Sequence, residues 1–161
     1  MLDKLSHLDD AGRSRMVDVS AKKSSHRRAI AEARLHVPPS VMTALGSGDT
    51  PKGNVFEVAR LAGIMAAKST SALIPLCHAL PLDHVDVTFE CSIECVRITA
   101  YVTTHAKTGV EMEALTASSV AALTLYDMLK ALSHAMTIEH VRLLNKTGGK
   151  SGDYTVEAES R

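Results

Sequence analysis

The feature of this sequence that most constrains its fold is a pair of alternating segments followed by one long uninterrupted segment. In residues 84–91 (HVDVTFEC), Val85, Val87 and Phe89 alternate with polar residues. Residues 94–103 alternate in the same way, so the two runs are predicted to pair as an antiparallel hairpin. Residues 110–134 contain no Gly or Pro and carry a broad apolar face, which predicts a long helix.

The remaining segments complete a mixed pattern. Residues 55–68 are apolar on nearly every face, which predicts a largely buried helix with Asn54 as its cap. Short strands are predicted at residues 16–20, 136–145 and 153–157. This order indicates an α+β class. We expect a ferredoxin-like antiparallel sheet with helices packed on one face, and a different α+β sandwich is the alternative.

A length of 161 residues suits a single domain over residues 1–161. Residues 1–15 are polar and unpatterned, so a flexible tail is expected there. Residues 37–54 are rich in Pro and Gly, which predicts a mobile loop with one helical turn after Pro39. Residues 22–36 form a basic stretch whose structure the pattern leaves unassigned.

Charge and aromatic content exclude some classes of partner. The chain has 18 Lys+Arg and 18 Asp+Glu, a net charge of zero, and only 3% aromatic residues. It therefore lacks the basic surface and the stacking platform of a generic nucleic-acid binder. No apolar run approaches the roughly 18 residues that a membrane span needs, so no membrane partner is expected.

The three cysteines are an odd number, and no secretory signal is visible, so we expect reduced thiols in a cytoplasmic protein. Cys91 and Cys95 lie four residues apart, and a zinc site there would need His84 or His78 as further ligands. No second Cys/His pair at ligand spacing exists, so no metal is predicted. Both are expected to be small buried side chains.

Two polar clusters lie on the long predicted helix. Glu111 and Glu113 are either an acid/base pair with one raised pKa or an acidic first turn that the helix dipole favours. Asp127 and Lys130 share a helix face and form either a surface ion pair or a pair at an interface or cleft.

A third cluster is Cys77-His78. Neighbouring side chains of an extended segment point to opposite faces, so these two are not expected to form a nucleophilic dyad. His78 is either a general acid/base or phosphate ligand, or a structural histidine.

The fourth cluster is KTGGKSG (146–152). It is not a P-loop, because Leu144 stands where that motif requires Gly. A Gly-rich turn with Lys146 and Lys150 can nevertheless hold phosphate oxygens, with Lys52 closing over the same anion. The alternative for each lysine is a solvated surface charge.

Helix length suggests how these clusters combine. Glu113 and Asp127 lie fourteen residues apart on one helix, which corresponds to roughly 21 Å. One small-molecule site cannot easily contact both from the same helix, so we expect the active site to lie between subunits of a homo-oligomer.

Seven segments closely resemble the molybdenum cofactor biosynthesis protein C family, the cyclic pyranopterin monophosphate synthases. They are SAK (20–22), KG (52–53), VARLAGIMAAK (58–68), LIPLCH (73–78), KTGVEMEALTA (107–117), LYDMLK (125–130) and KTGGKSG (146–152). The resemblance runs from about residue 14 to residue 158. The chain departs from the family pattern at Asn54 and Ala79, where the family usually has Asp and Pro.

The resemblance implies a ferredoxin-like lyase that converts a cyclic dihydroguanosine triphosphate into cyclic pyranopterin monophosphate and diphosphate. It implies catalytic positions at Asp127, Lys130, Lys146, Glu113 and Lys52. It implies substrate-binding positions at Leu76, Cys77, His78, Glu111, Met112 and Glu113. It also implies a cytoplasmic homohexamer, a trimer of dimers with sites between subunits.

The implied chemistry needs cations for the phosphates and several proton transfers. Crowded ammonium groups lower one another's pKa, so a lysine with a depressed pKa is expected beside the carboxylates. No cofactor is expected, and nothing in the sequence indicates Mg²⁺. A non-catalytic oligomeric sensor of a nucleotide or phosphate is the alternative function.

Overall fold

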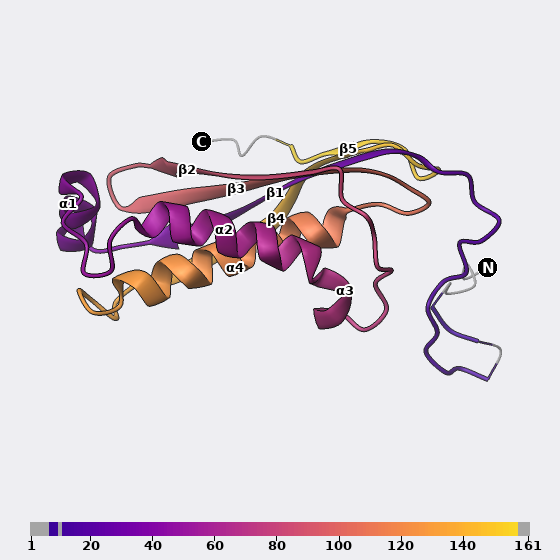
Figure 1. The fold of residues 1–161 in the computed structure, drawn as a ribbon, viewed down its shortest axis with the longest axis horizontal. Helices are drawn as coiled ribbons and strands as arrows, with labels where there is room; N and C mark the ends of the chain where they lie inside the picture. The colour runs from indigo at the N-terminus through magenta and orange to yellow at the C-terminus, as the bar shows by residue number, and fades with distance from the viewer. Residues whose placement is uncertain (1–6, 10, 158–161) are drawn as a thin grey trace.

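The computed structural model describes residues 7–9 and 11–157 and contains a five-stranded antiparallel sheet (Figure 1). The strands are β1 (Ser25–His36), β2 (His84–Cys91), β3 (Cys95–Ala106), β4 (Thr137–Thr147) and β5 (Tyr154–Thr155). Their spatial order is β2-β3-β1-β4-β5. The predicted hairpin is therefore present as β2 and β3, with Val85 paired to Val102 and Phe89 to Ile98.

The helices are α1 (Pro39–Ser47), α2 (Val55–Lys68), α3 (Thr70–Leu73) and α4 (Glu111–Leu129). The two long helices, α2 and α4, pack on one face of the sheet, whereas α1 lies at the end of the sheet (Figure 1). Figure 1 shows α2 and α4 side by side beneath the strands, with α4 running along most of the sheet. An α+β fold with this strand order and with helices on one face confirms the ferredoxin-like prediction.

Small residues let the two long helices approach each other and the sheet. Gly63 of α2 faces α4 so closely that an added Cβ would lie 3.0 Å from the Ala117 carbonyl oxygen and 3.0 Å from a methyl of Val87. Ala59 of α2 and Ala121 of α4 are fully buried. This close packing holds α4 rigidly, so both of its ends have fixed positions. No described helix is long and apolar enough to cross a membrane.

The basic stretch left unassigned by the sequence is β1, which lies in the middle of the sheet. Ala29, Ala31 and Ala33 face the helices and are fully buried. Glu32 points to the other face and is 2% exposed. Its carboxylate is held by three guanidinium groups, from Arg34 at 3.3 Å, Arg97 at 3.5 Å and Arg142 at 2.8 Å. A buried carboxylate is stable in such a strand because its charge is paired.

Several boundaries differ from the prediction. Residues 16–20 are irregular and do not form the predicted strand. The loop predicted at residues 37–54 contains the nine-residue helix α1, more than the single turn expected. Helix α4 was predicted to reach residue 134 but ends at Leu129, because the backbone enters a turn directly after Leu129.

Two further predictions concern exposed regions. Cys91 is exposed and Cys95 is half-buried beside the β2–β3 turn, so the expectation that both are buried is wrong for Cys91. Of the tail predicted at residues 1–15, residues 1–6 and 10 lie outside the described residues. In the described part, Leu8 pairs with Ser14 in an isolated bridge.

Candidate active site

The first turn of α4 places two carboxylates beside a cavity. Glu113 is only 4% exposed, and burial raises the pKa of its carboxyl, with the charge of Glu111 adding to the rise. The Glu111 carboxylate folds back over Gly109, where any side chain would collide with it. Burial therefore shifts Glu113 toward the protonated form, which is the form that can donate a proton.

Leu76, Cys77 and His78 follow α3 and lie against these carboxylates. Together they line a cavity of about 450 Å³, which we call the His78 cavity. Its other predicted substrate-binding residues are Glu111, Met112 and Glu113, so the structure brings all six into one place. Burial raises the pKa of the Cys77 thiol, and the charge of Glu113 adds to the effect, so this cysteine is a neutral thiol and not a thiolate nucleophile.

His78 is anchored on one side. Its Nε2 lies 2.8 Å from the carbonyl oxygen of Val17, in the irregular segment that precedes β1. Val17 and His78 are far apart in the sequence, so the local pattern around His78 could not predict this contact.

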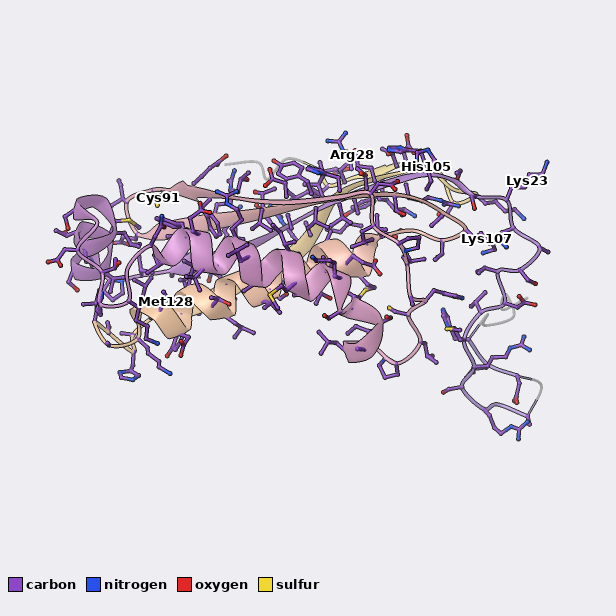
Figure 2. All side chains as sticks on the ribbon, in the orientation of Figure 1. Lys23, Arg28, Cys91, His105, Lys107 and Met128 are labelled. Atoms are coloured by element: carbon purple, nitrogen blue, oxygen red, sulfur yellow. The ribbon has the colours of Figure 1, made fainter. Side chains whose placement is uncertain are left out.

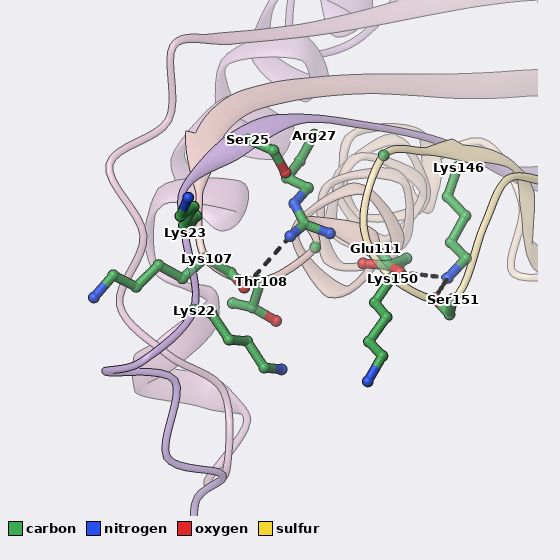
Figure 3. A pocket seen from close by; sticks show the side chains of 12 residues that line it. Lys22, Lys23, Ser25, Arg27, Lys107, Thr108, Glu111, Lys146, Lys150 and Ser151 are labelled. Carbon is green, nitrogen blue, oxygen red and sulfur yellow. Dashed lines mark hydrogen bonds and ion pairs between the residues drawn. The ribbon is translucent and has the colours of Figure 1, made fainter.

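A second cavity of about 530 Å³ adjoins the first and shares walls with it at Lys22, Thr108, Gly109 and Glu111. We call it the cationic cavity. Six basic side chains line it, those of Lys22, Lys23, Arg27, Lys107, Lys146 and Lys150. In Figure 3, Lys22 and Lys150 extend in the same direction from facing walls. Such a density of cations suits a polyphosphate.

Lys146 reaches this cavity because of the strand register. It pairs with Ala29, whose side chain faces the helices, so Lys146 also points toward α4. Its Nζ donates to Ser151 Oγ at 2.8 Å and lies 3.5 Å from Glu111 Oε1. The ammonium group of Lys146 thus lies in the wall of the cationic cavity, beside the Glu111 carboxylate.

The turn after Lys146 packs directly on β1. Gly149 has a φ of 95°, and a Cβ there would collide with the guanidinium of Arg27. Arg27 in turn donates to the carbonyl oxygens of Ala106 at 3.4 Å and Lys107 at 3.5 Å. The Gly-rich turn therefore fits against Arg27 and returns Lys150 and Ser151 to the cavity.

The other predicted catalytic residues form a separate group at the far end of α4, which we call the Asp127 cluster. Lys52 Nζ donates to Asp127 Oδ2 at 2.9 Å and to its backbone carbonyl oxygen at 3.1 Å. Lys130 Nζ lies 2.7 Å from Asp127 Oδ1. Hydrogen bonds from Lys130 and Lys52 lower the pKa of Asp127 to about 2.

This geometry corrects one expectation. The same hydrogen bond and charge of Asp127 raise the pKa of Lys130, so Lys130 is not the lysine with a depressed pKa predicted from crowding. The carboxylate outweighs the neighbouring ammonium because it lies within hydrogen-bond distance of Lys130.

The predicted site residues thus fall into two groups, as helix length suggested. Figure 2 shows Met128, next to Asp127, and Lys107, in the cationic cavity, toward opposite ends of the molecule. One chain does not bring the Asp127 cluster to the two cavities.

The sequence had not singled out Lys22, Lys23, Arg27 and Lys107 as site residues. Their basic character was visible, and three of them lie in the unassigned stretch. Only the fold shows that this stretch passes the start of α4.

Comparison with known proteins shows which family this chain belongs to. A family model described as the MoaC family matches residues 16–149. The chain belongs to the MoaC family. Its MoaC relatives include a cyclic pyranopterin monophosphate synthase of Nostoc sp. that is 57% identical over 152 residues, covering 93% of this chain and 90% of the relative. A protein of the same name from Roseiflexus sp. is 52% identical over 155 residues, covering 95% of this chain and 98% of the relative.

A third relative of that name, from Thermomicrobium roseum, is 51% identical over 156 residues and covers 96% of this chain. The MoaC match includes the Asp127 cluster and most residues of both cavities, but not His7 of the His78 cavity or Lys150 and Ser151 of the cationic cavity.

Proposed function

We propose that this chain is a cytoplasmic lyase of molybdenum cofactor biosynthesis, a cyclic pyranopterin monophosphate synthase that releases diphosphate from a cyclic dihydroguanosine triphosphate. The observation that carries the proposal is the junction of two cavities. One holds six basic side chains, and the other holds a buried carboxyl with a raised pKa. Relatives with this activity in their names are 51 to 57% identical.

The cationic cavity would bind the triphosphate. Lys146, Lys150 and Arg27 line it from β4, the Gly-rich turn and β1, while Lys22 and Lys107 enter from loops. These cations neutralise the phosphates and the charge that develops as diphosphate leaves. The proposal includes no cofactor, and the sequence does not indicate Mg²⁺.

The His78 cavity would hold the ring system, where bonds are opened and closed again. Glu113 is the proposed proton donor there, because burial raises the pKa of its carboxyl. Leu76, Met112 and Cys77 supply apolar contacts, which suits a site in a chain with no Trp.

The Asp127 cluster would complete the site from another subunit. Asp127 would hold Lys52 and Lys130 in place through ion pairs until the substrate phosphates draw a lysine away, which would let the lowered pKa of the Asp127 carboxyl rise. The outer surface of the helix layer suits such an assembly, because large apolar side chains are exposed on it. They are Val58, Leu61, Met65, Leu73 and Leu123, each more than 40% exposed. We propose a homohexamer, built as a trimer of dimers.

The direct test is to incubate the protein with the cyclic triphosphate and to measure diphosphate and pterin product together. The expected result is equimolar release of both. The matched control is Lys68→Ala, which removes an exposed lysine at the end of α2 and should turn over as the wild type does. Binding without diphosphate release would instead indicate a sensor, and no binding would indicate neither function.

A further inference from the structure

The irregular segment formed by residues 16–22 contacts the site through its backbone. The carbonyl oxygen of Val17 lies 2.8 Å from His78 Nε2, and the carbonyl oxygen of Ser20 accepts a 2.8 Å hydrogen bond from Lys107 Nζ. Val17 and Val19 also line the His78 cavity, and Lys22 lines both cavities. Figure 1 shows this segment leaving β1 at the end of the sheet where the loop before α4 also turns.

The segment has no strand partner, and its own turns hold its shape. The Asp18 carboxylate accepts a 2.8 Å hydrogen bond from the Ser20 backbone N–H, and Lys22 N–H donates to the Val19 carbonyl at 3.0 Å. Hydrogen bonding from Ser20 lowers the pKa of Asp18, so this carboxylate stays ionised at neutral pH. An aspartate that accepts the N–H two residues later fixes the intervening backbone.

The contact with Val17 determines which imidazole nitrogen carries a proton. A backbone carbonyl can only accept a hydrogen bond, so His78 Nε2 must be the protonated nitrogen. The neutral ring then has Nδ1 as its acceptor. A histidine whose tautomer is fixed in this way is prepared for one direction of proton transfer.

We propose that residues 16–22 form a positioning strap, in which the Val17 carbonyl holds His78 in its Nε2–H form and Asp18 keeps the strap in register with the site. The role in turnover rests on the function proposed above, whereas the tautomer of His78 does not. The Asp18 carboxylate hydrogen-bonds within the strap, to the Ser20 backbone N–H, and the charge of Lys107 in the cationic cavity also acts on it.

The test compares three single variants by imidazole ¹⁵N NMR of the protein without substrate, at a pH where histidine is neutral. His78→Gln identifies the His78 signal in the wild type. The wild type should show the Nε2–H tautomer alone, and Asp18→Ala should show a mixture of the two. Asp18→Asn keeps an acceptor oxygen and should restore the wild-type pattern.

A matched control exists in the same part of the chain. Asp9 also accepts a backbone N–H two residues on, from Ala11 at 2.9 Å, but it lies outside the strap of residues 16–22. Asp9→Ala should leave the His78 signal unchanged. In turnover, Asp18→Ala should lower kcat/KM by about 10-fold through the misplaced histidine, with recovery in Asp18→Asn.

A His78 found in its Nδ1–H form, or an Asp18→Ala spectrum identical to the wild type, would overturn the strap. If Asp18→Ala does not fold, Ser20→Pro removes the donor of the same hydrogen bond and decides the question. If the tautomer shifts as expected but the wild type releases no diphosphate, the strap stands and the proposed reaction fails.

Discussion

Lys52 and Asp127 are 75 residues apart in sequence, yet Lys52 Nζ donates to the Asp127 carboxylate at 2.9 Å and to its backbone carbonyl at 3.1 Å. This contact ties the loop before α2 to the end of α4. Lys130 binds the other carboxylate oxygen at 2.7 Å, so one carboxylate serves two lysines that are both about half-exposed. The arrangement leaves the ammonium groups accessible to an anion from outside the chain.

The pKa of Asp127 predicts an acid-dependent stability difference. Because its folded-state pKa is lowered to about 2, the ionised carboxylate stabilises the folded protein above the ordinary aspartate pKa, about 3.9. That contribution disappears as the pH falls toward 2. Melting temperatures of the wild type and Asp127→Asn should therefore differ most above about pH 4 and converge near pH 2.

The control is Asp49→Asn, which removes a carboxylate from the loop that carries Lys52 but outside the Asp127 cluster. A constant difference between wild type and Asp127→Asn over the whole pH range would contradict the pairing with Lys52 and Lys130.

The separation of the two groups predicts complementation between inactive variants. Lys146→Ala damages the cationic cavity and Asp127→Ala damages the distant cluster, so each alone should lose more than about 100-fold in turnover. If each site takes one group from each of two subunits, mixed oligomers regain intact sites. Random mixing of equal amounts should restore about one quarter of the wild-type activity.

The matched negative control is a mixture of Lys146→Ala with Glu113→Gln, because both positions belong to the same group and no mixed site is intact. Full loss of activity in the Lys146→Ala and Asp127→Ala mixture, despite mixed oligomers in solution, would contradict a site that takes one group from each of two subunits.

The hairpin and the long helix could be predicted because their patterns are local. The alternation at Val85, Val87 and Phe89 is visible in eight residues, and the absence of Gly and Pro from α4 is visible in nineteen. The middle strand β1 could not be predicted in the same way. Its Glu32 is stable there only because Arg97 and Arg142, on the neighbouring strands, pair with it.

In the candidate site, too, some residues could be predicted from local motifs and others depend on residues that are distant in the sequence. Motifs indicated Glu113, His78 and Lys146, and the structure places all three around two adjoining cavities. The contribution of Lys107 depends on a contact with Ser20, 87 residues away, which no local pattern contains. The pattern predicted a lysine with a depressed pKa without naming it, and Lys130 is not that lysine, because Asp127 lies 2.7 Å away and raises its pKa.

We expect Glu113 to lower the stability of the folded protein at neutral pH and to be needed for turnover. Since burial raises its pKa in the folded state, ionisation disfavours folding as the pH rises through the ordinary glutamate pKa. Glu113→Gln removes this cost and should melt at a higher temperature than the wild type at neutral pH, with the difference vanishing in acid. Its turnover should fall by about 10²- to 10⁴-fold, because the amide cannot donate a proton as the acid does.

Glu111→Gln provides the comparison, because its side chain is 32% exposed and Lys146 lies 3.5 Å away. It should not melt higher than the wild type. Stabilisation by both substitutions would point to a general effect of lost negative charge at the start of α4 and against burial of Glu113 as the cause.

The Gly-rich turn should tolerate a methyl group at one position and not at another. Gly149 and Gly152 both have positive φ, of 95° and 75°, so alanine at either position costs about 1 to 2 kcal/mol of backbone strain. At Gly152 an added Cβ meets nothing within 4 Å, whereas at Gly149 it collides with Arg27. Chemical denaturation should therefore show a larger loss of stability for Gly149→Ala than for Gly152→Ala.

Gly149→Ala should also raise the KM for the triphosphate, because it pushes Arg27 and the turn bearing Lys150 apart. Equal losses in the two variants would show that strain alone acts there and that the packing of this turn on Arg27 does not shape the cationic cavity.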